Sequence, residues 1–385
     1  MADNGHVENK SISKWILAGV AIVLLAIIFY VPIWWVSLTA PNYPPESFPD
    51  GVRINFHVNG VFNGCRRAGR REIKEKEALD CVHEMDTINH YVGMYPIAAG
   101  APIERAFSQF LLPFLGVMIV AFVIRRRNVR IAIMAVGFGI IAVWMYVTVY
   151  TPDGVVHENT GYLKSLVSSL EEGIGDEGAD TNPSATGQNV IERLKQSLAE
   201  DQHQARQQKQ RSVKQRLVKV LHDSYMADHF KTGVGKSWIG SGYQVMSWHY
   251  GKTLARYFNE PREIRPMVHK LRIAINIVFW GLIAAMILLV VGAAMGRGVL
   301  YWLEIIVPAG LPLFFVIDYS AWLWWFGHNL NRMGAFTVKP FMPTVFGDGK
   351  VAQFTTHSYP YYGFGLMVLF AVVVAVIALI RRKEA

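Results

Sequence analysis

The stretch IAIMAVGFGIIAVWMYVTVY, residues 131–150, contains no charged side chain. A helix of this length reaches about 30 Å, which is the thickness of the hydrocarbon core of a membrane. Because lipid offers no hydrogen-bond partner to the backbone, such a segment must be helical. The composition agrees, since 52% of the 385 residues are hydrophobic and only 17% are charged. These features favour a membrane protein over a soluble one.

Five other runs have a similar apolar character and length. They lie at residues 15–36, 106–124, 273–295, 299–322 and 361–380. The first run ends within VPIWWVSLTAPNYPP (31–45), which has no small-residue cleavage site and is aromatic like a membrane interface. We therefore expect an uncleaved anchor rather than a signal peptide. The prediction is a mainly α-helical polytopic membrane protein with six transmembrane helices, four of them paired in hairpins over 106–150 and 273–322.

Lys and Arg in the short connections predict the orientation. They occur in four places, which are Lys10 and Lys14, RRRNVR (125–130), Arg297 and RRK (381–383). All four fall on one side of the predicted membrane, and the positive-inside rule assigns that side to the cytoplasm. We expect a bacterial inner-membrane protein with residues 1–14 and the tail of 361–385 in the cytoplasm. Much of the net charge of +9 then reflects topology, and no nucleic-acid partner is expected.

Three segments are consequently expected in the periplasm, at 37–105, 151–272 and 323–360. In the first, VRINFHVNGVF (52–62) alternates apolar and polar residues, which predicts a strand in a small mixed α/β domain. In the second, residues 171–188 are rich in Gly, Asp and Ser and predict a flexible linker, and a long charged helix is expected over 189–230. The prolines and glycines of the third predict a structured loop with one short strand.

The chain has two cysteines, Cys65 and Cys81, and both lie in the first of these segments. In an oxidising compartment, the favoured interpretation is a single disulfide that closes a short loop. The alternative is ligation of a metal by the thiolates, which would require the bond to be open.

The stretch CVHEMDTINHYVGM, residues 81–94, is rich in side chains that bind metals. A helical periodicity places His83, His90 and Met94 on one face, with Asp86 at its edge. Imidazole beside thioether favours copper, especially Cu(I), and Asp86 would orient the ring of His90. Haem with His and Met axial ligands is the alternative, although the absence of a CxxCH motif excludes covalent c-type haem. The simpler interpretation is that these residues only pack and form hydrogen bonds near a membrane.

Two acidic residues lie in the predicted span 299–322. Glu304 and Asp318 are 14 positions apart, so in a continuous helix they would lie near one face. Ionisable groups in a membrane are costly and suggest an ion path, and Pro308 and Pro312 would break the helix between them. Alternatively, Asp318 lies close enough to the outer end to be hydrated.

Three pieces of the chain resemble a known family. They are APNYPP (40–45), INHYVGM (88–94) and PFMPTVFGDGKVAQFTTHSYP (340–360). They are similar to motifs of a poorly characterised family of bacterial membrane-associated proteins whose genes accompany those of copper enzymes such as nitrous oxide reductase. The resemblance implies a setting in copper-enzyme maturation rather than a reaction. It marks His90 and Met94, and more loosely His357.

The leading hypothesis is therefore copper binding or transfer at the periplasmic face, in support of a periplasmic or membrane-bound copper enzyme. In it, His90, Met94, His83 and His357 would hold the metal, in a site where the first and third outer segments meet. One alternative is a redox subunit that carries haem or copper, and another is a structural or sensory scaffold without metal. A transport path through Glu304 and Asp318 is a weaker idea, and no catalytic motif is apparent.

Overall fold

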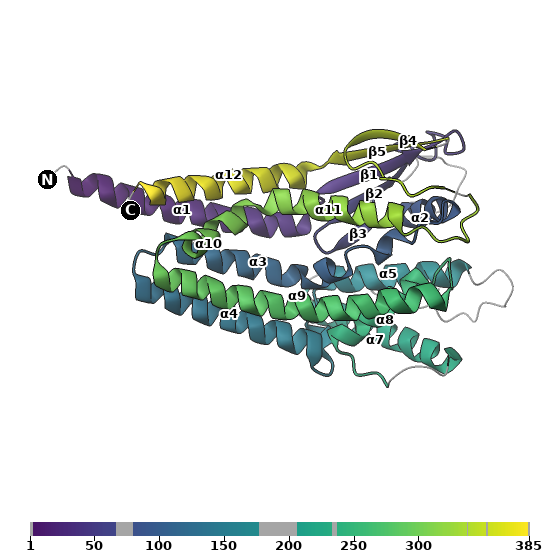
Figure 1. Cartoon of the computed structure of the whole chain (residues 1–385), viewed down its shortest axis with the longest axis horizontal. Coiled ribbons are helices and arrows are strands. Elements are labelled where there is room, and N and C mark those ends of the chain that lie inside the picture. The colour runs from purple at the N-terminus through teal and green to yellow at the C-terminus, as the bar shows by residue number, and fades with distance from the viewer. Residues whose placement is uncertain are drawn as a thin grey trace. The chain divides into compact units, whose positions relative to one another are not determined.

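The computed structural model describes residues 3–66, 80–176, 206–232, 237–336, 338–351 and 353–383. The chain divides into two compact units. The first consists of Met1–Met145 and Ile273–Ala385, and the second of Tyr146–Arg272. The first unit contains the sheet and most of the apolar helices (Figure 1).

Five helices of the described residues are long and apolar enough to cross a membrane. They are α1 (Asp3–Tyr30, apolar from Ser13), α3 (Pro102–Val123), α4 (Arg127–Tyr150), α9 (Pro261–Met295) and α12 (Tyr362–Arg382). A sixth crossing is present if α10 (Val299–Ala309) and α11 (Leu311–His328) count as one bent span. The prediction of a mainly helical chain is confirmed, and its five or six candidate spans agree with a multi-pass membrane protein.

Two of the predicted spans differ from the structure. The run 15–36 does not stay helical, because α1 ends at Tyr30 and Trp34–Thr39 forms strand β1. The run 299–322 is not one straight helix, because α10 and α11 meet at 68° around Gly310. Pro308 lies inside α10 and Pro312 in the first turn of α11. A proline ring removes a backbone donor and clashes with the preceding turn, so it is tolerated mainly where a helix starts or bends.

The strands form one antiparallel sheet in the order β3-β2-β1-β5-β4. The other strands are β2 (Val52–His57), β3 (Gly60–Asn63), β4 (Gly347–Val351) and β5 (Phe354–Pro360). The loop predicted to hold one short strand therefore holds two. Because β1 pairs with β5, the segments near residues 37–105 and 323–360 meet in space, as the sequence hypothesis required (Figure 1).

Helix α2 (Cys81–Tyr91) covers one face of this sheet. Val36 and Ile54 point to this face and pack against Met85. Asp80 caps the helix by accepting hydrogen bonds from the backbone N–H groups of Val82 and His83.

Two further features hold the ends of α2. A disulfide joins Cys65 to Cys81, whose Cα atoms are 5.9 Å apart, and so fastens the start of the helix to the end of the β2–β3 hairpin. Gly93 follows the last turn with a φ of +85°, and a Cβ at this position would lie 2.5 Å from the carbonyl oxygen of Asn331. Only glycine allows both this conformation and this close approach.

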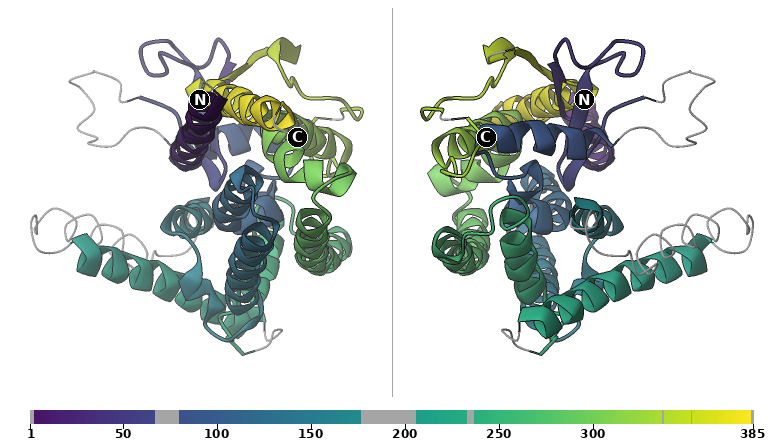
Figure 2. Two further views of the ribbon diagram at one scale, coloured as in Figure 1. Left: turned by 90° about the vertical axis from the view of Figure 1, so that its left-hand side faces the viewer. Right: turned by 90° about the vertical axis from the view of Figure 1, so that its right-hand side faces the viewer.

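The helices of the first unit pack along their length, with α1 beside α12 and α10 beside α3 and α12 (Figure 2). The two termini lie at one end of this unit and the sheet lies at the other (Figure 1). Several of the predicted basic connections also meet at the terminal end. Arg130 donates to the carbonyl oxygen of Ala293 at 2.7 Å, and Arg381 donates to the hydroxyl of Tyr301 at 3.2 Å.

The second unit contains η2 (Gly154–His157), α5 (Thr160–Asp176), α7 (Arg206–Thr232) and α8 (Gly242–Leu254). The predicted linker 171–188 is wrong for residues 171–176, because α5 continues through them, Gly173 and Gly175 included, and ends at Asp176. The rest of that linker and residues 189–205 of the predicted long helix lie outside the described residues. The described part of that helix, α7, runs from Arg206 to Thr232.

Candidate functional site

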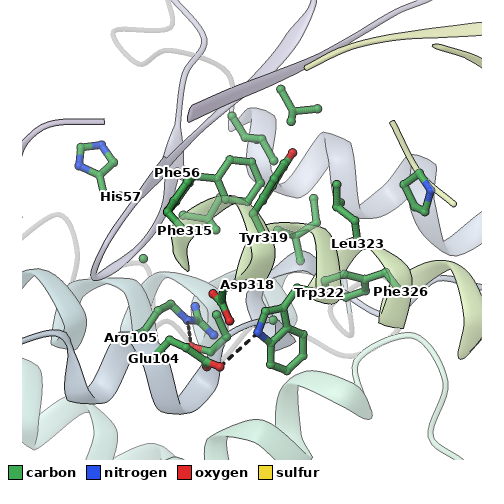
Figure 3. A pocket seen from close by; sticks show the side chains of 18 of the residues that line it. Phe56, His57, Glu104, Arg105, Phe315, Asp318, Tyr319, Trp322, Leu323 and Phe326 are labelled. Carbon is green, nitrogen blue, oxygen red and sulfur yellow. Dashed lines mark hydrogen bonds between the residues drawn. The ribbon is translucent and has the colours of Figure 1, made fainter. Parts of the chain in front are cut away.

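A cavity of about 1720 Å³ lies in the first unit, between the α2-covered face of the sheet and helices α3, α9 and α11 (Figure 3). Most small-molecule sites have volumes of roughly 300–1,000 Å³. The walls are mainly apolar and include many aromatic rings, among them Phe56, Phe107, Phe315, Tyr319, Trp322 and Phe326. Four of these rings come from α11, where spacings of three and four residues place them on one face of the helix.

One group of polar side chains in this cavity lies where α3 meets α11 (Figure 3). Other polar side chains line the cavity elsewhere, among them Asn42, Asn89, Lys350 and Gln353. The indole N–H of Trp322 donates to Oε1 of Glu104 at 3.4 Å. The carboxyl groups of Glu104 and Asp318 interact directly with each other. Glu104 lies in the first turn of α3, which starts at Pro102. Two acidic groups on different helices therefore face each other inside an apolar chamber.

Arg105 is the next residue on α3 and is 5% exposed. Its Nε donates to the carbonyl oxygen of Ala101 at 3.2 Å, and its Nη2 donates to the carbonyl oxygen of Ala98. These bonds tie the start of α3 to η1 (Ile97–Ala99). The guanidinium is thus directed toward backbone carbonyl groups that precede the helix.

His57, the last residue of β2, lines another part of the cavity. Burial lowers the pKa of its imidazole to about 4, and a hydrogen bond with the backbone of Tyr30 opposes part of this shift. The ring is consequently neutral at physiological pH and adds no charge to the cavity.

The predicted metal residues do not all come together. His83 and His90 are half-buried on α2, and Met94, just beyond the helix, is 7% exposed and lines the cavity. His357 lies on β5 opposite Ser37 of β1. Since side chains alternate along a strand, His357 belongs to the sheet face that α2 does not cover. The structure therefore does not bring His357 to His90 and Met94.

His357 has partners of its own on that open face. Its Nδ1 lies 2.7 Å from Oδ1 of Asp348, and its Nε2 lies 3.2 Å from the hydroxyl of Thr39. Tyr359 also donates to Asp348, and the bonds from His357 and Tyr359 lower the pKa of the Asp348 carboxyl. These contacts account for a polar cluster on the surface of the sheet.

Asp86 was predicted to orient the ring of His90. In the structure it is fully buried, and its Oδ1 accepts a hydrogen bond of 2.7 Å from the backbone N–H of Ile97, so it fastens α2 to η1. Within the described ranges, no group of three or more His, Cys, Asp and Glu side chains is arranged to hold a metal ion. A copper site would depend on methionine as well.

Glu304 and Asp318 do not share a helix face, because the chain bends between them. Asp318 lines the cavity beside Glu104, whereas Glu304 is fully buried on α10 and does not line it. Arg130 and Arg381 act on Glu304 electrostatically. Neither of its carboxylate oxygens accepts a hydrogen bond from the described part of the chain. The two acidic groups thus belong to separate environments.

Sequence reasoning missed Glu104 and Trp322. The available signal was an acidic residue two positions before the predicted apolar run 106–124 and two positions after Pro102. The importance of Glu104 depends on its partner Asp318 on α11, which lies 214 residues later in the chain. A single sequence does not show such a pairing.

Comparisons of this chain with protein-family models, with curated proteins and with solved structures found no match.

Proposed function

We propose that this membrane protein binds a hydrophobic small molecule with a polar head group in the cavity of its first unit. The observation that carries the proposal is a chamber of about 1720 Å³ with mainly apolar, aromatic walls and a pair of carboxyl groups where α3 meets α11. Small-molecule sites generally combine predominantly apolar walls with a few polar groups that fix the orientation of the ligand. The cavity has this composition.

The polar cluster supports binding over simple packing. Carboxyl groups inside an apolar chamber are costly, since they lose hydration without gaining a full set of partners. Glu104 and Asp318 are polar and add nothing to the apolar walls of the cavity. A ligand that reaches them would supply the missing polar contacts, and its apolar body would cover the aromatic walls.

The proposed ligand comes from the membrane. The cavity is bounded by helices that are apolar enough to span a bilayer and by the sheet at their end. An amphiphile that partitions into lipid would have its apolar part at the depth of the helices and its head near the sheet. If the basic end of the unit is cytoplasmic, the sheet and the head-group end face the periplasm.

Filling the cavity tests this proposal. Leu323 lines the cavity, whereas Leu313 on the same helix is 65% exposed and does not line it. The full chain, Leu323→Trp and Leu313→Trp would be purified in lipid nanodiscs and titrated with the neutral dye Nile red. We expect saturable binding to the parent and to Leu313→Trp, and a loss of at least about tenfold in affinity for Leu323→Trp. Absence of saturable binding, or equal binding by all three proteins, would contradict the proposal.

We also propose copper binding or transfer at α2 as a second candidate, in support of a copper enzyme. It is supported by the position of His83, His90 and Met94 on one short segment, whose start is held by a helix cap and a disulfide. Imidazole with thioether is a donor set that suits Cu(I). A redox role with haem or copper would use the same residues and would give visible absorbance, because Cu(I) is colourless.

A further inference from the structure

We infer that the cavity selects lipophilic cations, and that the carboxyl pair of Glu104 and Asp318 releases its shared proton when the cation binds. This inference rests on the proposed function and names the class of ligand. It depends on the carboxyl pair, on its surroundings and on the aromatic walls of the same chamber.

The first step concerns the charge of the pair. Two carboxylates that touch in a medium of low dielectric constant cannot both ionise at low cost, so one proton is retained between them. Glu104 lies in the first turn of α3, where the helix dipole favours a negative charge, and it accepts the indole N–H of Trp322. Asp318 lies in the middle of α11 and has neither advantage. The retained proton therefore belongs to Asp318, and the pair carries one negative charge.

The second step concerns neighbouring positive charge. Arg105 is adjacent in sequence to Glu104, but its guanidinium donates to the carbonyl oxygens of Ala98 and Ala101. The charged residue that acts on Asp318 is Glu104, which is an acid and not a cation. His57, the imidazole in the wall, stays neutral because it is buried. Arg105 and Lys350 also line the cavity, but the guanidinium of Arg105 donates to backbone carbonyl groups and Lys350 lies on β4 with an exposed side chain. Neither acts on Asp318, so a cationic ligand would supply positive charge beside the carboxyl pair.

The third step concerns the walls. Phe315 and Tyr319 are stacked with their ring centroids 6.0 Å apart, and Trp322 and Phe326 extend this aromatic surface along α11. The face of an aromatic ring attracts a cation through its quadrupole, and the attraction is strongest where water is excluded. An apolar anion would fit the same walls but would be repelled by the carboxyl pair. A neutral molecule would gain only the apolar contacts.

The exchange balances in atoms and charge. Before binding, the pair holds one proton and one negative charge. As the cation enters, Asp318 loses its proton to water, and two carboxylates then face one cation, which leaves the net charge of the site unchanged. Because one proton is released for each cation bound, the affinity rises by up to about tenfold for each unit of pH. A ligand that releases no proton would show no such dependence.

The experiment uses probes of one shape and different charge. The full chain in lipid nanodiscs would be dialysed against tetraphenylphosphonium, tetraphenylborate or neutral triphenylphosphine oxide at about pH 6 and about pH 8, with empty nanodiscs as the blank. We expect saturable binding of the cation that is at least about tenfold tighter at the higher pH, with proton release into a weakly buffered solution. The anion should not bind saturably.

Three variants test whether Asp318 is the group that releases the proton. Asp318→Asn should remove both the pH dependence and the proton release, and Asp318→Glu should restore them. Glu304→Gln changes a buried carboxyl on α10 that does not line the cavity, and should leave both unchanged. Size-exclusion profiles would verify that the variants remain folded.

Two outcomes would overturn the inference and leave the proposed function intact. These are tighter binding of triphenylphosphine oxide than of the cation, and a pH dependence that persists in Asp318→Asn. If none of the probes and no neutral dye bind to the parent protein, the cavity is not a ligand site, and the proposed function fails together with the inference.

Discussion

At the scale of single residues, the surroundings of a side chain decide its protonation more than its type does. His57 lies at the end of β2, half-buried in the wall of the cavity, and its pKa is lowered to about 4. His357 lies on β5 beside Asp348 at 2.7 Å. The two imidazoles thus differ in their surroundings, since His57 is desolvated by burial and His357 lies beside a carboxylate.

The lowered pKa of His57 should make the free energy of unfolding depend on pH. The folded state favours the neutral ring, so the unfolded chain, whose His has a pKa of about 6.5, binds more protons in acid. The free energy of unfolding should therefore fall as the pH decreases from about 6.5 to about 4. Below about pH 4, His57 is protonated in both states and should contribute no further change. The slope from this group should not exceed about 1.4 kcal/mol per pH unit, because one imidazole takes up at most one proton.

The measurement is thermal unfolding of the parent and of His57→Leu, each near pH 4.5 and near pH 7.5. The parent should lose more of its Tm on acidification than the variant does. An equal loss in both proteins would assign the acid sensitivity to other groups.

At the scale of elements, α2 is the clearest case of a segment whose position is fixed at several points. Asp80 caps it, Cys81 is bonded to Cys65, and Asp86 bonds to the backbone of Ile97. The two histidines of the predicted copper site are on this helix, and Met94 follows it directly. His357 belongs to the far face of the sheet.

A copper site on α2 makes a specific prediction. After anaerobic reconstitution with Cu(I), the parent protein should hold about one copper ion, and His90→Ala with Met94→Ala should lose it. His357→Ala is the matched control and should keep it, because its side chain lies across the sheet. Metal analysis with visible spectra would decide this. An absence of copper in the parent, or its loss in His357→Ala, would contradict a site on α2.

The sequence predicted the elements unevenly, for physical reasons. The run 131–150 is uniformly apolar and is helical as α4, while the run 15–36 includes VPIWWV, whose apolar residues suit a span and a buried strand equally well. Hydrophobicity alone does not separate these two uses. The pairing of β1 with β5 joins residues more than 300 positions apart, and no local pattern specifies it.

At the scale of the whole molecule, the candidate site depends on the assembly of distant segments. The cavity is lined by residues from Val36 to Met367, and Glu104 and Asp318 meet only because α3 and α11 pack in one unit. The sequence showed Asp318 as an acidic residue in an apolar run. It did not show its partner, since the cost of burying one carboxyl beside another depends on the folded structure.

The arrangement of the first unit predicts how the chain crosses the membrane. Because β1 and β5 belong to one sheet, the loops that lead to them must lie on one side of the bilayer. Both native cysteines are bonded, so a single introduced cysteine would be the only free thiol. Suitable exposed positions are Glu46 between β1 and β2, Lys339 between α11 and β4, Arg297 between α9 and α10, and Lys383 directly after α12.

In intact cells, a membrane-impermeant maleimide should label Glu46→Cys and Lys339→Cys to the same extent. It should label Arg297→Cys and Lys383→Cys only after the membrane is permeabilised, if the positively charged end is cytoplasmic. The reverse labelling pattern would agree with the same fold but would mean that the protein has the opposite orientation in the membrane. Labelling of Glu46→Cys and Lys339→Cys from opposite sides would be incompatible with a sheet that pairs β1 with β5, and with a cavity closed by that sheet.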